Sequence, residues 1–129
     1  MKTEKRVPVQ KMHADHLQWL QDLNFYRDDL TIMDKRLMEI NKKNSIHAVT
    51  AWTEHFQNQI LIQSREINVL DKAIRKSEKI MDKAVAKFPA AFNEALVNEH
   101  GYLKERMAIF AKLFKSMRAE FNRFAAKVM

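Results

Sequence analysis

The sequence predicts an all-α protein, an up-down-up antiparallel bundle of three long helices with coiled-coil-like packing. The chain of 129 residues holds one Gly and two Pro, so it offers few of the residues that tight turns require. Hydrophobic residues make up 47% of the chain, which is enough to build a core. They recur at intervals of three and four residues, the spacing of an apolar stripe on a helix.

The bundle is expected to occupy residues 9–129 as a single domain, after a flexible basic lead over residues 1–8. Pro8 ends this lead and suits the first turn of a helix, but not its interior. A first helix is predicted from Val9 to Asn41. The residues expected on its inner faces are His13, His16, Trp19, Leu20, Leu23, Tyr26, Leu30, Met33, Leu37 and Ile40.

A tight helical hairpin is predicted at residues 41–45, because Asn44 or Ser45 can accept hydrogen bonds from the free N–H groups of the next helix. The second helix should run from Ile46 to Lys87, about 40 residues. It should end before Pro89, because the residue preceding a proline is disfavoured in the α region. Its expected inner stripe is Trp52, Phe56, Ile60, Ile67, Leu70, Ile74, Met81 and Val85.

A third helix is predicted to begin between Ala90 and Glu99 and to run nearly to the C-terminus. Asn93 and Asn98 are alternative N-caps, and Gly101 is unfavourable in the first turns. The expected inner stripe is Leu96, His100, Leu103, Met107, Phe110, Phe114, Met117, Phe121, Phe124 and Val128. Two short connections would make the first and third helices parallel, with the second reversed between them.

Composition argues against several functional classes. The absence of cysteine excludes disulfides, thiolate metal sites and a nucleophilic cysteine, and it suits a cytoplasmic protein. No segment approaches the roughly 20 apolar residues of a membrane span, so membrane insertion is not expected. A single glycine excludes a phosphate-binding Gly-rich loop, and no serine lies in a nucleophile-elbow motif. The sequence therefore predicts no enzyme and no catalytic residues.

The net charge of +7 favours polyanions as partners through long-range attraction. The basic residues alternate with Asp and Glu along the predicted helices, a pattern typical of a solvated helical face. A basic run near the C-terminus contains Lys112, Lys115, Arg118, Arg123 and Lys127. The Phe residues between them fall on the predicted core stripe, where they cannot stack on bases. Nucleic-acid association is therefore an alternative that the sequence does not favour.

Metal binding is a second alternative. Neither the Glu-x-x-His pairs of ferritin-like di-iron sites nor the His-x-x-x-Glu pattern of hemerythrins occurs. Folding the chain at about residues 44 and 88 nonetheless brings a cluster to one end of the bundle, with imidazole and carboxylate groups that suit a divalent transition metal. The candidate ligands are His13, His16, Glu78, Glu99 and His100. The competing interpretation is that these histidines are polar caps at a hydrated bundle end.

A buried polar network is predicted near the centre of the bundle. Its expected members are Tyr26, His55, Gln59, Gln63, Glu66 and Arg118. Buried polar groups must be hydrogen-bonded, so such a network would fix the register of the helices. A ligand pocket is the alternative interpretation of the same residues.

Residues 54–59 read Glu-His-Phe-Gln-Asn-Gln, and Ile62, Gln63, Arg65 and Glu66 follow. Together these residues resemble a motif of uncharacterised small helical proteins from Bacteroidetes-type bacteria. The resemblance covers most of the chain and implies a natural bacterial bundle, but it implies no activity. It is also carried by His16, Trp19, Leu20, Phe25, Tyr26, Arg118, Ala119, Glu120, Phe121, Arg123 and Phe124.

The function expected from these observations is that of a non-enzymatic interaction or scaffold protein without a cofactor. Its long apolar faces would self-associate into a homodimer or hold a partner helix. The exposed aromatic residues expected to contribute are Trp19, Trp52 and Phe92.

Overall fold

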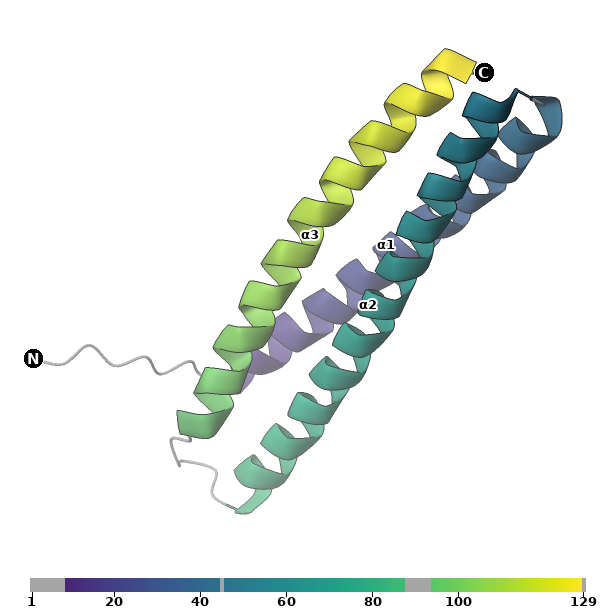
Figure 1. Cartoon of the computed structure of the whole chain (residues 1–129). Coiled ribbons are helices and arrows are strands. Elements are labelled where there is room, and N and C mark those ends of the chain that lie inside the picture. Colours follow the sequence, from purple (N-terminus) through teal and green to yellow (C-terminus); the bar gives the residue numbers. More distant parts are fainter. Residues whose placement is uncertain (1–8, 45, 88–93, 129) are drawn as a thin grey trace, which may run out of the picture.

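The computed structural model describes residues 9–44, 46–87 and 94–128. Three helices make up almost all of them: α1 (Val9–Lys43), α2 (His47–Lys87) and α3 (Glu94–Val128). Figure 1 shows them as long rods, with α1 behind α2 and α3. The predicted all-α, three-helix class is confirmed. The expected basic lead, Ser45, the Phe88–Pro89 break, Phe92 and Asn93 lie outside the described residues.

The chain ascends α1, returns along α2 and ascends again along α3 (Figure 1), as predicted. Ion pairs between α1 and α3 agree with this parallel arrangement. Asp15 pairs with His100 near the start of both helices, and Asp29 pairs with Arg118 further along both. α1 packs most extensively against α2 and least against α3.

The turn after α1 is closed by Asn44, but in a different way from the predicted one. Its backbone N–H donates to the carbonyl of Ile40 at 3.1 Å, and its side-chain Nδ2 donates to the same oxygen at 2.9 Å. Asn44 therefore satisfies a free carbonyl at the end of α1, and the prediction that it caps α2 is wrong. Lys42 and Lys43 in the last turn of α1 suit the negative end of the helix dipole.

α3 begins at Glu94, whose carboxylate suits the positive end of the helix dipole. Asn98 lies inside the helix, so its predicted role as an N-cap is wrong. Gly101 also lies within the helix, and a Cβ added there would meet no atom within 4 Å. The structure thus gives no steric reason for a glycine at this position.

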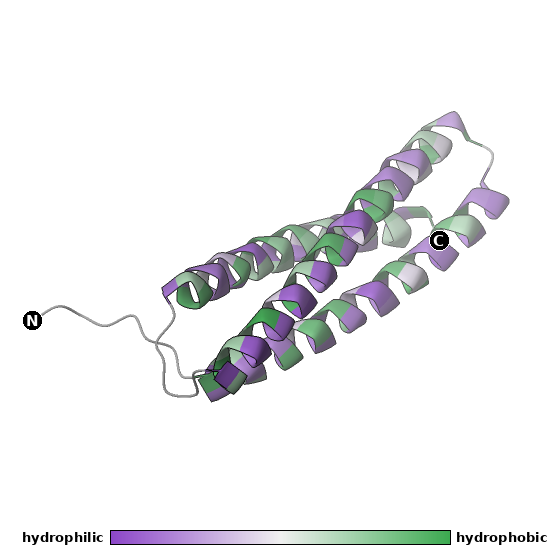
Figure 2. Cartoon of the chain, turned by 90° about the horizontal axis from the view of Figure 1, so that it is seen from below, coloured by the Kyte–Doolittle hydropathy of each residue, from purple (hydrophilic) through white to green (hydrophobic). Residues whose placement is uncertain are grey.

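One hydrophobic core runs along all three helices, because each helix buries residues at the predicted three-four spacing. Figure 2 shows hydrophobic and hydrophilic residues alternating along each helix. Aromatic rings link the helices: Tyr26 of α1 lies 4.7 Å from Phe114 of α3, and Phe56 of α2 lies 5.4 Å from Phe121, measured between ring centroids. Among the fully buried side chains are Leu23, Leu37, Ile67, Leu70, Ile74 and Leu103.

Trp52 departs from the predicted core, because its side chain is 48% exposed. It lies near the start of α2, where its ring stacks on Phe56 and lies 6.2 Å from Phe124. Trp52 therefore covers the core from outside at this end of the bundle. Within the described residues, none of the helices combines the length and apolar character needed to cross a membrane.

Candidate functional site

Histidines and carboxylates meet where α1 and α3 begin and α2 ends. We call this cluster the histidine end; its members are His13, Asp15, His16, Glu78 and His100. His13 and His16 are three residues apart on α1 and therefore project from the same face. Glu78 comes from the last turns of α2 and His100 from the second turn of α3. All three helices contribute to the cluster.

Glu78 bridges two of the histidines. Nδ1 of His16 donates to Oε1 of Glu78 at 2.6 Å, and Nδ1 of His13 donates to the other carboxylate oxygen. Burial raises the pKa of Glu78, but the hydrogen bonds from His16 and His13 outweigh it and leave the pKa below its usual value. Because an ionised carboxylate only accepts hydrogen bonds, each of the two imidazoles donates to Glu78 through a proton on Nδ1.

His100 is held in a similar way by Asp15. Its Nε2 donates to Oδ2 of Asp15 at 2.9 Å, and Lys11 donates to the other oxygen at 2.7 Å. Burial raises the pKa of Asp15, but the hydrogen bonds from Lys11 and His100 outweigh it and lower the pKa overall. Burial lowers the pKa of His100, in spite of the carboxylate beside it. At neutral pH His100 is therefore neutral, with its proton on Nε2.

The second ring nitrogens of the two buried histidines have no hydrogen-bond partner. These atoms are Nε2 of His16 and Nδ1 of His100. The two residues are 2% and 4% exposed, and their ring centroids lie 5.5 Å apart. Trp19 stacks on His100 at 4.9 Å and encloses the pair further.

The structure brings together most of the residues predicted as a metal site. Glu99 is the exception, because it accepts a hydrogen bond from Ser77 at 3.4 Å. Asp15 was not among the predicted residues, although the parallel register of α1 and α3 places it beside His100. In the part of the chain that the structure describes, no three His, Cys, Asp or Glu side chains are grouped so as to hold a metal ion.

The predicted central network is not one buried network. Of its six members, Gln63 is buried, Arg118 is exposed and the others are half-buried. Its charged members pair with residues outside the predicted set, because they lie on the flanks of their helices and not on the core stripe. The pairs are His55 with Glu120 at 3.0 Å, Arg106 with Glu66 at 2.7 Å, and Arg118 with Asp29 at 2.9 Å.

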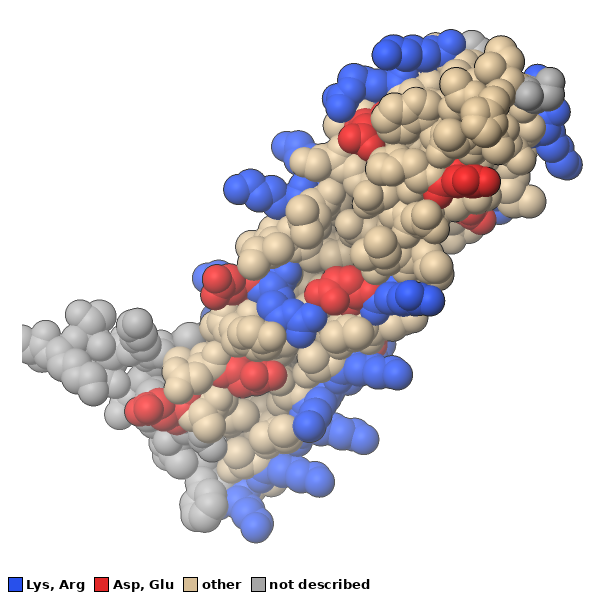
Figure 3. All heavy atoms as spheres, in the orientation of Figure 1, with Lys and Arg blue, Asp and Glu red and all other residues tan. Residues whose placement is uncertain are grey.

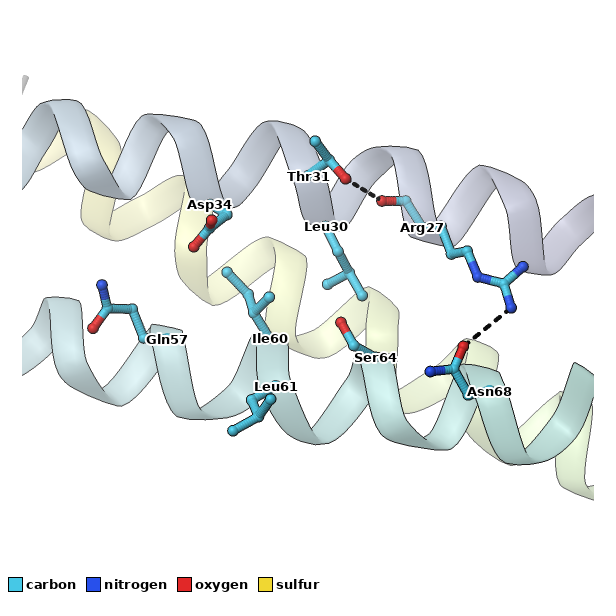
Figure 4. Close-up of a pocket in the computed structure, with 9 residues that line it drawn as sticks. All are labelled: Arg27, Leu30, Thr31, Asp34, Gln57, Ile60, Leu61, Ser64 and Asn68. Carbon is cyan, nitrogen blue, oxygen red and sulfur yellow. Dashed lines mark hydrogen bonds between the residues drawn. The ribbon is translucent and has the colours of Figure 1, made fainter.

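A groove between α1 and α2 has a volume of about 440 Å³. We call it the polar groove; it is lined by Arg27, Leu30, Thr31, Asp34, Gln57, Ile60, Leu61, Ser64 and Asn68. Arg27 crosses it and donates to Asn68 at 3.3 Å (Figure 4) and to Asp71 at 3.1 Å. Figure 4 also shows the side chain of Leu61 directed away from α1. Hydrogen bonds between helices thus span this groove.

A second groove, on the opposite flank of α2, lies against α3 and has a volume of about 340 Å³. We call it the apolar groove; it is lined by Ile62, Gln63, Glu66, Arg106, Ile109, Phe110 and Leu113. Its aliphatic rim is open to solvent: Ile62, Ile109 and Leu113 are each more than half exposed. Val69 lies seven residues after Ile62 on α2, and Tyr102 lies seven residues before Ile109 on α3. Both side chains are about half exposed.

Figure 3 shows this face of the molecule, with α2 and α3 in front of α1 as in Figure 1. Uncharged surface runs between the two helices, and most of the Lys and Arg side chains project at its margins. Acidic and basic groups lie together near its middle. On this face most of the basic side chains therefore lie beside the apolar groove, whereas the groove itself contains the Glu66–Arg106 ion pair.

The aromatic residues among the C-terminal basic residues are buried, as predicted: Phe110, Phe114, Phe121 and Phe124 belong to the core.

No protein-family model matches the chain, and neither does a curated protein or a solved structure. The resemblance to small bacterial helical proteins stays a prediction.

Proposed function

We propose that this protein is a non-enzymatic bundle that self-associates through the apolar groove. The observation that carries the proposal is the row of large apolar side chains left exposed along one flank of α2 and the facing flank of α3. These side chains are Ile62, Val69, Tyr102, Ile109 and Leu113, between 49% and 59% exposed. Contiguous apolar surface of this kind is typical of protein interaction sites.

The spacing of these residues suits a helical partner. Ile62 and Val69 are seven residues apart on α2, and Tyr102 and Ile109 are seven apart on α3. Residues at this spacing form a nearly straight row along a helix, and the ridges of another helix pack between two such rows. A partner that offers helical ridges of its own would therefore bury both rows at once.

The charges of the groove favour a second copy of this chain as the partner. A chain with a net charge of +7 repels its own copies over most of its surface. Among the described residues that line the apolar groove, however, Glu66 and Arg106 are the charged ones, and they neutralise each other. In a two-fold symmetric dimer the same patch meets itself, so Glu66 of each copy can face Arg106 of the other.

A buried polar atom in the groove also favours a partner. Gln63 lines the groove and is 7% exposed, and its Oε1 accepts no hydrogen bond. Buried side-chain oxygens without a donor are uncommon in folded proteins. Because this atom has no exposed surface in the single chain, the Gln63 side chain must turn toward the groove for a donor of a second copy to reach it.

The experiment is a measurement of molar mass as a function of concentration by sedimentation equilibrium. The wild-type protein should approach twice the chain mass of 15.3 kDa as its concentration rises. Ile109→Glu places a charge in the apolar groove and should keep the protein at the monomer mass. Leu61→Glu is the matched control, because Leu61 is similarly exposed but lies on the other flank of α2.

Leu61→Glu should associate as the wild type does. A wild-type chain that stays monomeric at all concentrations would refute the proposal. Equal loss of association in both variants would assign the contact to another surface.

A further inference from the structure

The histidine end contains two buried imidazole nitrogens that no group of the protein satisfies. They are Nε2 of His16 and Nδ1 of His100, from α1 and α3 respectively. Most buried polar atoms in folded proteins have a hydrogen-bond partner, so two unpaired nitrogens on adjacent rings need an explanation. Self-association through the apolar groove does not provide one, because that groove has other residues.

Carboxylates fix the tautomers of both rings. The opposite nitrogen of each ring donates to a carboxylate: Nδ1 of His16 to Glu78, and Nε2 of His100 to Asp15. In the neutral form of each ring the free nitrogen therefore carries a lone pair and no hydrogen. Histidines that bind metal ions typically donate their other ring N–H to a carboxylate, which orients the ring and raises its basicity. Both histidines have this arrangement.

The electrostatics of the histidine end suit a cation despite the positive charge of the whole chain. Asp15 and Glu78 hydrogen-bond to the two rings and bring two carboxylates to this end of the bundle. The two rings are thus flanked by two negative charges at close range.

The separation of the rings is compatible with a shared ion. Two imidazoles that bind one ion through nitrogens at about 2.0–2.1 Å, with a near-tetrahedral angle, have ring centroids about 5–5.5 Å apart. The ring centroids of His16 and His100 lie 5.5 Å apart.

We infer that Nε2 of His16 and Nδ1 of His100 bind one divalent transition-metal ion, with Glu78 and Asp15 orienting the two rings. Imidazole ligands suit zinc, copper, nickel and cobalt ions. In the described residues no third metal-binding side chain is grouped with this pair, so further ligands of the ion must come from solvent. The inference is independent of the proposed self-association and concerns different residues.

Trp19 provides a direct readout, because its ring stacks on His100 at 4.9 Å. The experiment is a titration with Co²⁺ of the Trp52→Phe variant, in which Trp19 is the remaining tryptophan. Fluorescence of Trp19 should be quenched and should saturate at one ion per chain. The control is Trp19→Phe, whose Trp52 lies beside His55 at 5.4 Å. Its fluorescence should stay unchanged over the same range.

Ligand identity is tested by His16→Ala and His100→Ala in the Trp52→Phe background. Each should raise the half-saturating Co²⁺ concentration at least tenfold. His47→Ala, at the opposite end of the bundle, should leave this concentration unchanged. If either buried variant fails to fold, the wild-type protein gives the answer through the ¹⁵N resonances of its imidazoles. Zn²⁺ should shift Nε2 of His16 and Nδ1 of His100 and leave the resonances of His47 and His55 in place.

Three results would overturn the inference. One is the absence of saturable quenching together with unchanged imidazole resonances, which would mean that water satisfies the two nitrogens. Another is binding that survives both substitutions. The third is equal quenching of Trp19 and Trp52, which would indicate non-specific association of the ion with surface histidines.

Discussion

The polar and apolar grooves lie on opposite flanks of the same helix, and a hydrogen bond between helices crosses each of them, but the two grooves differ in the side chains around that bond. Arg27 of α1 reaches across the polar groove to Asn68 and Asp71 of α2. The apolar groove has the Glu66–Arg106 pair at its centre and exposed aliphatic residues such as Ile62 and Ile109 on its rim. Both grooves border the same core.

The two surfaces of α2 differ in their flank residues, which lie next to the buried residues in the sequence. Polar side chains such as Ser64 and Asn68 line the α1 side of α2, and Asn68 accepts a hydrogen bond from Arg27. Apolar side chains on the α3 side, such as Ile62 and Val69, remain in water in the isolated chain. Because each of these side chains is about half exposed, burying the exposed part is worth about 1 kcal/mol per side chain, which is the driving force for the proposed association.

The largest effect is expected from a change in the core that both grooves share. Phe114→Ala removes a ring that is 2% exposed and packs against Tyr26. The free energy of unfolding should fall by about 3–5 kcal/mol because a cavity replaces the ring. Urea unfolding at a concentration where the protein is monomeric measures this change.

Leu113→Ala is the control for this prediction. Leu113 adjoins Phe114 in sequence but is 57% exposed, in the apolar groove. It should change the unfolding of the monomer by less than about 1 kcal/mol and should weaken association. If the two variants lost similar stability as monomers, Leu113 would be part of the core and the groove would not be an open surface.

The next largest effect is expected at the centre of the apolar groove. Arg106→Met leaves Glu66 without its partner and should weaken dimerisation about tenfold, or about 1.4 kcal/mol. The double variant Glu66→Leu with Arg106→Met replaces the pair by apolar groups and should associate at least as tightly as the wild type. Sedimentation equilibrium on the three proteins measures both changes. A double variant as weak as the single one would show that the charges themselves hold the copies together.

A smaller effect is expected beside the polar groove. Burial raises the pKa of Asp71, but the hydrogen bonds from Arg75 and Arg27 outweigh it and lower the pKa overall. A carboxyl whose pKa is lowered by folding stabilises the fold above its unfolded pKa of about 3.9. Asp71→Asn should therefore cost about 1 kcal/mol at pH 7.

This cost should decrease as the pH falls below about 3.9, the unfolded pKa, and passes through the lower pKa of Asp71 in the folded protein. Asp71 of the wild type is then protonated, so it loses the charge that the Asn variant lacks. Urea unfolding of both proteins across this pH range measures the difference. The dimer mass at pH 7 should be unchanged. A cost that is independent of pH would mean that the ion pairs of Asp71 contribute nothing.

The smallest effect is expected where α3 meets α1. Arg118 and Asp29 form an ion pair at 2.9 Å with side chains that are 51% and 35% exposed. Such pairs contribute little because water screens them, so Arg118→Ala should change the free energy of unfolding by less than about 0.5 kcal/mol. A loss above 1 kcal/mol in urea unfolding would reveal a role in positioning α3 that the structure does not indicate.

Periodicity predicted the helices and most of the core because burial repeats with the helical turn. It failed at Trp52 and His13, which have the expected spacing but are exposed near the ends of the bundle. Counting residues from the two turns predicted that His13, His16 and Glu78 would meet, since a hairpin fixes which layers face each other. Asp15 lies outside the expected inner stripe of α1, so spacing did not single it out as the partner of His100.

The apolar groove could be predicted only as a general possibility of wide apolar faces. Which residues line it depends on how far the flanks of α2 and α3 separate, and spacing alone does not give that distance. The sequence therefore drew attention to Trp19, which is half-buried beside His100. It did not single out Ile109 or Leu113, whose exposure depends on the packing of two helices.

The central claim is that copies of this chain meet through the apolar groove, and cross-linking tests it most directly. The chain has no cysteine, so Ile109→Cys and Leu61→Cys each introduce one unique thiol. With a short bismaleimide cross-linker, Ile109→Cys should give a covalent dimer and Leu61→Cys should stay largely monomeric. A dimer formed equally by both variants, or by Leu61→Cys alone, would contradict the account.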